Sequence, residues 1–207
     1  MAIFEHLRSL NKVFHYFACK IKQSIELHGY DDFNIEKYFR KQGVEVGENN
    51  RIQLRNLGEE AYLIKIGNHC TICADVRLLV HDGAGWVFTQ DFPDIQKLGR
   101  IHIMDNCFIG IRSTILPNVK IGPNSIVGAC SVVTKDVPPG VVVAGNPAKK
   151  ICSIDVYKEK VLKSWAKQRP PGYLADLEPG VIYPPRFIEK MKRSQRELLK
   201  THLSKLL

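Results

Sequence analysis

The chain has 207 residues, of which 44% are hydrophobic and 25% charged, and it carries a formal net charge of +9. This is the composition of a globular protein, and the lack of any run of 18 apolar residues excludes a membrane-spanning helix. The positive charge suits an anionic substrate, cofactor or membrane surface, whereas the usual nucleic-acid-binding motifs are missing, so we expect no nucleic-acid partner. Without a secretory signal pattern, the expected location is the cytoplasm.

Residues 1–33 are predicted to form a helical extension. Apolar residues recur there at alternating steps of three and four, at Ile3, Leu7, Leu10, Phe14, Phe17, Ile21 and Ile25. This spacing gives a helix one apolar face. The simpler interpretation is that the face packs on the protein's own oligomer. The alternative is peripheral contact with an anionic membrane surface, at the inner face of the membrane, because the other positions include Arg8, Lys12, Lys20 and Lys22.

A six-residue period fills the middle of the chain. The blocks IMDNCF, IGIRST, ILPNVK, IGPNSI, VGACSV and VTKDVP follow one another from Ile103, and each begins with Ile or Val. Earlier blocks begin at Ile66, Ile72 and Leu78. Another pair, from Val46 and Ile52, is out of phase by two residues, which indicates a small insertion near residues 58–62.

This period predicts a solenoid. Each block supplies a short strand with an inward apolar residue and a tight turn, and three blocks close a triangular coil of about 18 residues. A β-sandwich would instead show period two with irregular turns. We therefore expect a mainly β protein, a parallel β-helix with α-helical flanks at both ends.

Cys70 and Cys73 form a CxxC spacing, which can indicate zinc or redox chemistry. A second CxxC that would complete a four-thiolate zinc site is missing. The repeat explains Cys70 better, as a small inward side chain. We expect no metal, since the spacing of the histidine ligands in β-helix carbonic anhydrases is also missing.

The repeat lapses in a loop over residues 80–101, which contains the stretch HDGAGWVF (81–88). Loops that project from a rigid scaffold often carry function. His81 is the candidate general base, because imidazole has an unperturbed pKa of about 6.5 and exchanges protons near neutrality. Asp82 or Asp75 is expected to orient it, and the loop residues Gly83 and Trp86 are candidate contacts of the substrate. His69 and His102 lie within or beside regular blocks and are expected to face solvent.

Residues 153–207 are predicted to form a C-terminal helical extension. It contains a helical stretch around residues 155–168, a proline-rich connection, and a basic last helix from about residue 186. The charged residues of that last helix are expected to form a solvated face.

The closing segment VVTKDVPPGVVVAGNPAKKI (132–151) closely resembles that of hexapeptide-repeat acyltransferases. The HDGAGWVF stretch is most similar to the O-acetyltransferases of polysaccharide assembly, and KYFRKQGVEVGENNRI (37–52) resembles the segment leading into their first coil. The resemblance implies a left-handed parallel β-helix as the acyltransferase domain, here residues 34–152.

The resemblance also implies a homotrimer with active sites between subunits, and acetyl-CoA as cosubstrate. In this chain the matching cofactor-binding positions are Ile111, Ala129, Thr134, Lys135, Lys149 and the neighbouring Lys150. An arginine often found just beyond this segment is replaced by Cys152, which weakens the match at the phosphates.

The expected function is transfer of an acetyl group from acetyl-CoA to a hydroxyl of a saccharide, in cell-surface polysaccharide (O-antigen or capsule) biosynthesis. One alternative is an N-acetyltransferase acting on a nucleotide sugar or an antibiotic. The other is a β-helix scaffold without catalysis.

Overall fold

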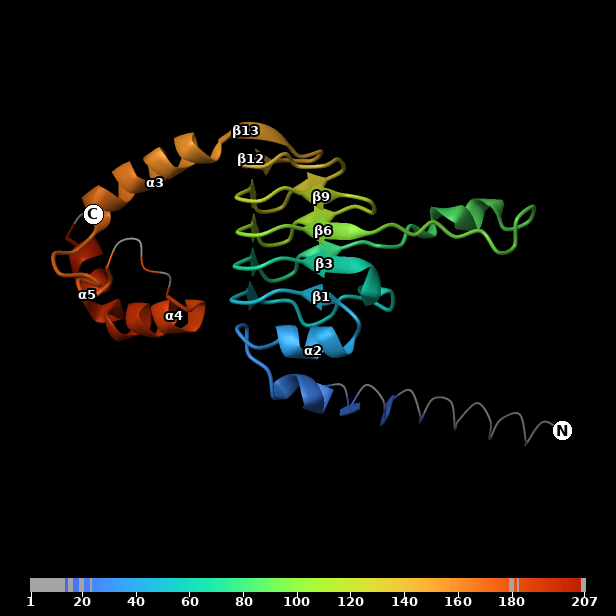
Figure 1. Ribbon diagram of the computed structural model, residues 1–207, viewed down its shortest axis with the longest axis horizontal. Helices are drawn as coiled ribbons and strands as arrows, with labels where there is room; N and C mark the ends of the chain where they lie inside the picture. Colours follow the sequence, from blue (N-terminus) through green and yellow to red (C-terminus); the bar gives the residue numbers. More distant parts are fainter. Residues whose placement is uncertain are drawn as a thin grey trace.

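The computed structural model describes residues 14, 17–18, 21–22, 24–178, 181 and 183–205. Its body is a three-sided column of stacked β-coils, with helix α2 below the first coil and a group of C-terminal helices beside the column (Figure 1). A long arm leaves the opposite side of the column.

Three sheets form the sides of the column. Side A comprises β1 (Glu45–Val46), β3 (Ile64–Ile66), β6 (Ile101–Ile103) and β9 (Lys120–Ile121). Side B comprises β2 (Arg51–Ile52), β4 (Thr71–Ile72), β7 (Phe108–Ile109), β10 (Ile126–Val127), β12 (Val141–Ala144) and β13 (Lys149–Ser153). Side C comprises β5 (Arg77–Leu78), β8 (Thr114–Ile115) and β11 (Val132–Val133). Neighbouring strands are parallel except β12 and β13, which are antiparallel.

The predicted repeat is confirmed by the strand register. Phe108 pairs with Ile126, so residues 18 positions apart stack on successive coils. The aliphatic residues that open the blocks fill the core, and Ile72, Ile109 and Ile121 are fully buried. In the first coil Glu45 pairs with Lys65, two residues further than 18, and the predicted insertion holds a 3-10 helix, η1 (Ala61–Leu63).

Small polar side chains line the core beside the aliphatic ladder. The thiols of Cys70 and Cys107 donate to the carbonyls of Met104 and Gly122 at 3.0 and 3.1 Å. A hydrogen bond with the Cys107 thiol, together with burial, raises the pKa of Cys70, so it stays a thiol at neutral pH. Cys70 is therefore the inward structural residue that the repeat predicted.

The corners of the coils require a left-handed backbone. Positive φ angles occur at Asn49, His69, Asn106 and Asn124 in the corner between sides A and B, and at Asp75, Arg112 and Cys130 in the corner between sides B and C. Asn and Asp tolerate this conformation better than most residues, which explains their frequency in the repeat.

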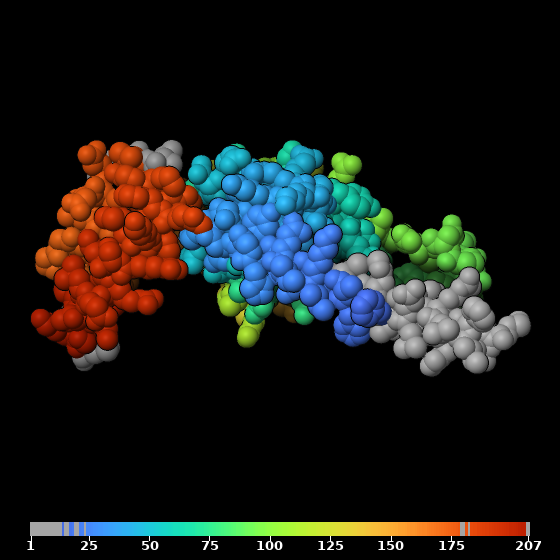
Figure 2. Space-filling model, turned by 90° about the horizontal axis from the view of Figure 1, so that it is seen from below, coloured from blue at the N-terminus to red at the C-terminus, as the bar shows by residue number. Residues whose placement is uncertain are grey.

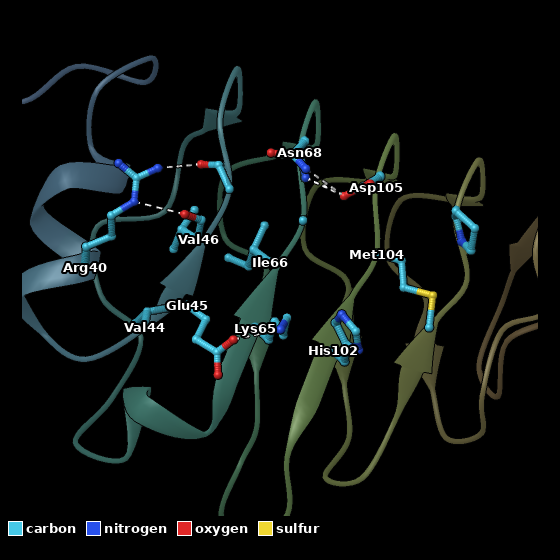
Figure 3. A pocket seen from close by; sticks show the side chains of 13 residues that line it. Arg40, Val44, Glu45, Val46, Lys65, Ile66, Asn68, His102, Met104 and Asp105 are labelled. Atoms are coloured by element: carbon cyan, nitrogen blue, oxygen red, sulfur yellow. Dashed lines mark hydrogen bonds and ion pairs between the residues drawn. The ribbon is translucent and has the colours of Figure 1, made fainter.

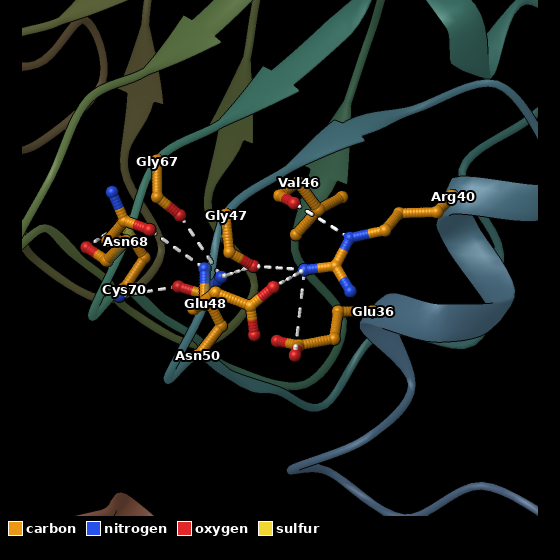
Figure 4. Close-up of polar contacts among 9 residues, drawn as sticks. All are labelled: Glu36, Arg40, Val46, Gly47, Glu48, Asn50, Gly67, Asn68 and Cys70. Carbon is orange, nitrogen blue, oxygen red and sulfur yellow. Dashed lines mark hydrogen bonds and ion pairs between the residues drawn. The ribbon is translucent and has the colours of Figure 1, made fainter.

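Helix α2 (Glu36–Lys41) covers the lower end of the column. It buries Tyr38 and Phe39 against the first coil. Figure 4 shows how Arg40 fastens the helix to that coil: its guanidinium donates to the carbonyls of Val46 and Gly47 at 2.9 and 2.7 Å and pairs with Glu48 at 2.8 Å. The column thus begins with a capped edge.

The C-terminal residues run back along the column. Helix α3 (Ile154–Gln168) begins at the Ser153 cap directly after β13. The basic segment expected as one last helix is divided at Gln195 into α4 (Pro185–Ser194) and α5 (Arg196–Leu203). An ion pair between Arg186 and Asp31 joins α4 to the residues that precede α2. Seen from below, these helices lie on the side of the column opposite the arm (Figure 2).

The predicted N-terminal helix is described only in part. Residues 24–28 are helical, and Phe14, Ile21 and Ile25 are exposed. Ile3, Leu7, Leu10 and the basic residues Arg8, Lys12 and Lys20 lie outside the described residues. Among the residues that are described, no helix is both long and apolar enough to cross a bilayer.

We predict that Ile109→Ala destabilises the column by about 2–5 kcal/mol, because a fully buried aliphatic ladder residue leaves a cavity between rigid neighbours. Chemical denaturation measures the change. Val161→Ala on α3, where the side chain is 46% exposed, is the matched control and should change the unfolding free energy by less than about 0.5 kcal/mol. Equal effects of the two substitutions would contradict the ladder as the source of stability.

Candidate active site

The arm formed by residues 80–100 is the longest departure from the coil (Figure 1). Its two limbs are joined at the base by backbone hydrogen bonds from Asp82 to Lys97 and from Gly99 to Val80, both 2.9 Å long. His81 forms an isolated antiparallel bridge with Leu98 at the same place. The backbone of His81 is therefore fixed where the arm meets the column, and its side chain is 48% exposed.

Glu60 is the carboxylate that faces His81. Its Oε1 lies 3.9 Å from the Nδ1 of His81, and its side chain is 29% exposed. A small movement would close this distance to a hydrogen bond. Glu60 belongs to the insertion before η1, so the repeat gave no signal that it would reach the base of the arm.

Asp82, one of the two predicted orienting acids, has other partners. Its carboxylate pairs with Lys97 at 2.8 Å and accepts the N–H of Ala84 at 3.0 Å, which caps the 3-10 helix η2 (Gly83–Phe88). The Lys97 ammonium, followed by this N–H, holds the pKa of Asp82 below its ordinary value. Asp82 therefore stabilises the base of the arm.

Asp75, the other predicted acid, lies in the corner between sides B and C, whereas His81 follows the far end of β5. Its carboxylate lies 3.6 Å from the Nε of Arg112. The structure does not bring Asp75 to His81 within the chain.

The arm itself is largely apolar and exposed. Trp86, Val87, Phe88 and Phe92 are 79%, 73%, 54% and 60% exposed. A side chain at Gly83 would meet nothing within 4 Å, so packing within the chain does not require glycine there. The predicted substrate contacts Gly83 and Trp86 thus both face open space.

Ile111 and Ala129 occupy equivalent positions in successive coils, at the corner between sides B and C. The N–H of Cys130 donates to the carbonyl of Ile111 at 2.9 Å, and a Cβ on Gly110 would come within 2.5 Å of the Ala129 nitrogen. Glycine is thus needed for the close stacking of this corner. Within residues 24–178, the backbone N–H of Ala129 has no hydrogen-bond acceptor, whereas the N–H of Ile111 donates to the Cys73 sulfur; both Ile111 and Ala129 are exposed.

The other predicted cofactor residues lie higher in the column. Thr134 and Lys135 form the exposed corner after β11, and Lys149 and Lys150 are exposed on β13. The N–H of Ala148 donates to the carbonyl of Val132 at 2.8 Å, which brings the start of β13 beside β11. Exposed cationic side chains are therefore present in the upper coils of the column, as an anionic ligand requires, while Cys152 is half-buried.

The two rival histidines have different surroundings. His69 is an exposed corner residue, and its Nδ1 lies 2.9 Å from the side-chain oxygen of Asn106. His102 lies on side A, where it lines a hollow of about 650 Å³ together with Lys65, Met104 and Arg40 (Figure 3). Burial, followed by the charge of Lys65, lowers the pKa of His102, which is half-buried rather than fully solvent-facing.

Comparison with known proteins agrees with this architecture. The family described as bacterial transferase hexapeptide (six repeats) matches residues 100–135. The protein CapG of Staphylococcus aureus is 51% identical over 132 residues, which cover 62% of this chain and 77% of CapG. The chain belongs to the hexapeptide-repeat acyltransferases.

Further relatives of this hexapeptide-repeat acyltransferase are acetyltransferases. A 2,3,4,5-tetrahydropyridine-2,6-dicarboxylate N-acetyltransferase of Clostridium perfringens is 51% identical over 76 residues, 37% of this chain and 32% of that enzyme. The chain thus spans about a third of that relative.

The hexapeptide-repeat acetyltransferase VCA0836 of Vibrio cholerae has the same fold, with a TM-score of 0.53 and 22% identity over 66% of this chain and 89% of that one. The left-handed winding of the β-helix follows from this family. VCA0836 has also been solved in complex with acetyl coenzyme A.

We predict that the Asp82 carboxyl titrates below the ordinary aspartate value of about 3.9. A pKa that is lower in the folded chain than in the unfolded one stabilises the fold above the unfolded value, and this contribution is lost as the pH falls through the lowered pKa. Carbon-13 NMR titration measures the midpoint. Lys97→Met should raise it and Lys97→Arg should not; a midpoint indifferent to Lys97→Met would contradict the pairing.

Proposed function

We propose that the chain is an acetyl-CoA-dependent O-acetyltransferase that acts on a saccharide hydroxyl in cell-surface polysaccharide biosynthesis. The observation that carries the proposal is the exposed imidazole of His81 at the base of the arm, where the backbone is held and the Glu60 carboxylate lies 3.9 Å from Nδ1. Family membership supports the acetyl transfer, and the N–H group of Ala129, open within residues 24–178, suits a thioester ligand.

In the proposed reaction, His81 accepts the proton of the acceptor hydroxyl, whose oxygen bonds to the acetyl carbon as the thioester C–S bond breaks. The imidazolium then returns the proton to the departing thiolate of coenzyme A. The open N–H of Ala129 is suited to stabilise the oxygen that becomes negative, an effect worth about 10²–10³ in rate for one donor.

Glu60 is proposed as the positioning residue for His81, in place of Asp82 and Asp75. A carboxylate opposite Nδ1 favours the tautomer in which Nε2 is free to take a proton. Lys135, Lys149 and Lys150 are proposed to meet the phosphates of coenzyme A, and Thr134 its pantetheine arm.

The proposed assembly is a homotrimer with each site between two subunits. Support comes from the arm, whose aromatic side chains Trp86, Phe88 and Phe92 are left exposed by the described part of the chain. Ile111 and Ala129 also lie at a different corner from Thr134 and the arm, so neighbouring subunits would complete one cleft. The exposed Phe14, Ile21 and Ile25 support a peripheral contact of this cytoplasmic assembly with the membrane.

An amine acceptor is the second candidate, because the Clostridium perfringens relative is an N-acetyltransferase. Assaying matched amino sugars beside neutral hydroxyl sugars separates the two.

We predict that His81→Ala lowers turnover at least about 100-fold, since a positioned general base contributes about 10²–10⁴. The measurement is thiol release from acetyl-CoA across a saccharide panel. His69→Ala removes an exposed corner histidine and should leave turnover unchanged. Equal turnover of His81→Ala and the parent protein would reject His81 as the base.

We predict that Glu60→Gln lowers kcat about tenfold and leaves the KM values for acetyl-CoA and acceptor unchanged, because it loosens His81 without removing it. Glu60→Asp should recover part of the loss. Glu59→Gln alters the exposed neighbour and serves as the control. A change confined to KM, or an equal effect of Glu59→Gln, would exclude the positioning role.

A further inference from the structure

A second hollow, of about 830 Å³, lies at the corner between sides B and C in the lower coils. Three short segments line it, residues 53–56, residues 74–77, and Arg112 with Thr114. We call it the corner pocket.

The lining of the corner pocket has more cationic than anionic side chains. Its lining contains the guanidinium groups of Arg55, Arg77 and Arg112 and only one carboxylate, that of Asp75. Arg55 is held in place by Asp32 at 2.6 Å and by the carbonyls of Ile52 and Leu54. Its position is therefore fixed by the first coil.

The other two arginines are available to a ligand. Arg112 is 71% exposed, and its contact with Asp75 is long, at 3.6 Å. Arg77 is exposed on β5, and among the described residues its guanidinium has neither a hydrogen-bond nor an ion-pair partner. Guanidinium groups bind carboxylates and phosphates in a bidentate geometry, so these two side chains suit an oxyanion.

The pocket adjoins the corner proposed for the thioester. Arg112 directly follows Ile111, and its N–H donates to the carbonyl of Ala74 at 3.1 Å. Ala129, Ile111 and Ala74 thus occupy equivalent positions in three successive coils. In the lowest of these coils the Ala74 N–H donates to the Gln53 side chain at 3.2 Å, so the open N–H of Ala129 has no counterpart beside the pocket.

We propose that the corner pocket binds an anionic group, a carboxylate or a phosphate, of the saccharide acceptor. The inference rests on the proposed function, because it takes the thioester to lie at Ile111 and the acceptor to lie one coil further down. Arg77 and Arg112 are the specificity-determining residues, and Asp75 weakens the attraction for the anion.

Kinetics with matched acceptors test the inference. Thiol release from acetyl-CoA is compared for methyl glucuronide against methyl glucoside, for methyl galacturonide against methyl galactoside, and for hexose phosphates, which separates carboxylate from phosphate. We expect the charged member of each active pair to have the higher kcat/KM. Arg77→Ala should lower kcat/KM for the charged acceptor about 10- to 100-fold, as for loss of a charged hydrogen bond, and leave the neutral acceptor unchanged.

Two further variants sharpen the test. Asp75→Asn keeps a residue that tolerates the left-handed corner and removes the opposing charge, so the KM for charged acceptors should fall. Lys65→Ala removes a cation from side A, away from the pocket, and should change neither acceptor. Equal losses from Lys65→Ala and Arg77→Ala would show that net charge alone matters and would overturn the pocket.

Binding of the same saccharides, followed by NMR, keeps the inference separate from the proposed function. Transfer that requires His81 but prefers neutral acceptors would overturn the anionic pocket and leave the acetyltransferase intact. Silence with every acceptor, together with Arg77-dependent binding of the charged sugars, would retain the pocket and reject the proposed reaction. No Arg77-dependent binding and no preference for charge would overturn the inference.

Discussion

Backbone hydrogen bonds between successive coils set the positions of the side chains along the column. The N–H of Thr71 donates to Cys107, and that of Phe108 to Ser125, at 2.8 and 3.0 Å, so each coil is locked at a fixed height above the last. Because the register is parallel and constant, equivalent residues form vertical columns. Each corner therefore presents equivalent residues from coil to coil, and a substitution at one of them alters the corner in that coil alone.

The proposed catalytic groups use two different properties of this scaffold. Ile111 and Ala129 belong to the corner between sides B and C, where backbone hydrogen bonds set the spacing between successive coils. His81 belongs to the arm but lies at its base, where the bridge to Leu98 and the adjoining hydrogen bonds restrict it. The mostly apolar remainder of the arm can therefore serve contact between subunits without displacing the backbone of His81.

The sequence predicted the column well because its physical cause is local and repeated. Each Ile or Val starter, such as Ile109 or Ile121, carries the same signal every six residues. Glu60 escaped prediction because it lies in the insertion that breaks the phase, so its place beside His81 depends on a loop of irregular length. The corner pocket was equally hidden, since Arg55, Arg77 and Arg112 belong to three different coils.

The sequence favoured Asp82 and Asp75 as the residues that orient His81, but in the structure their carboxylates contact other side chains. Asp82 is adjacent to His81 in the chain, but neighbouring residues at the base of the arm have different partners, and Lys97 on the return limb takes its carboxylate. Adjacency along a chain is thus a poor guide to pairing where two antiparallel limbs meet.

The reversal of direction at β13 has a consequence for the behaviour of the column in a crowded solution. A parallel solenoid with bare ends could add further copies end to end, because its last coil offers unpaired N–H and C=O groups. Here one end is blocked by α2 and the other finishes in an antiparallel strand that carries Lys149 and Lys150. Growth into fibres is thereby opposed at both ends, and the lysines proposed to hold phosphates also repel a second column.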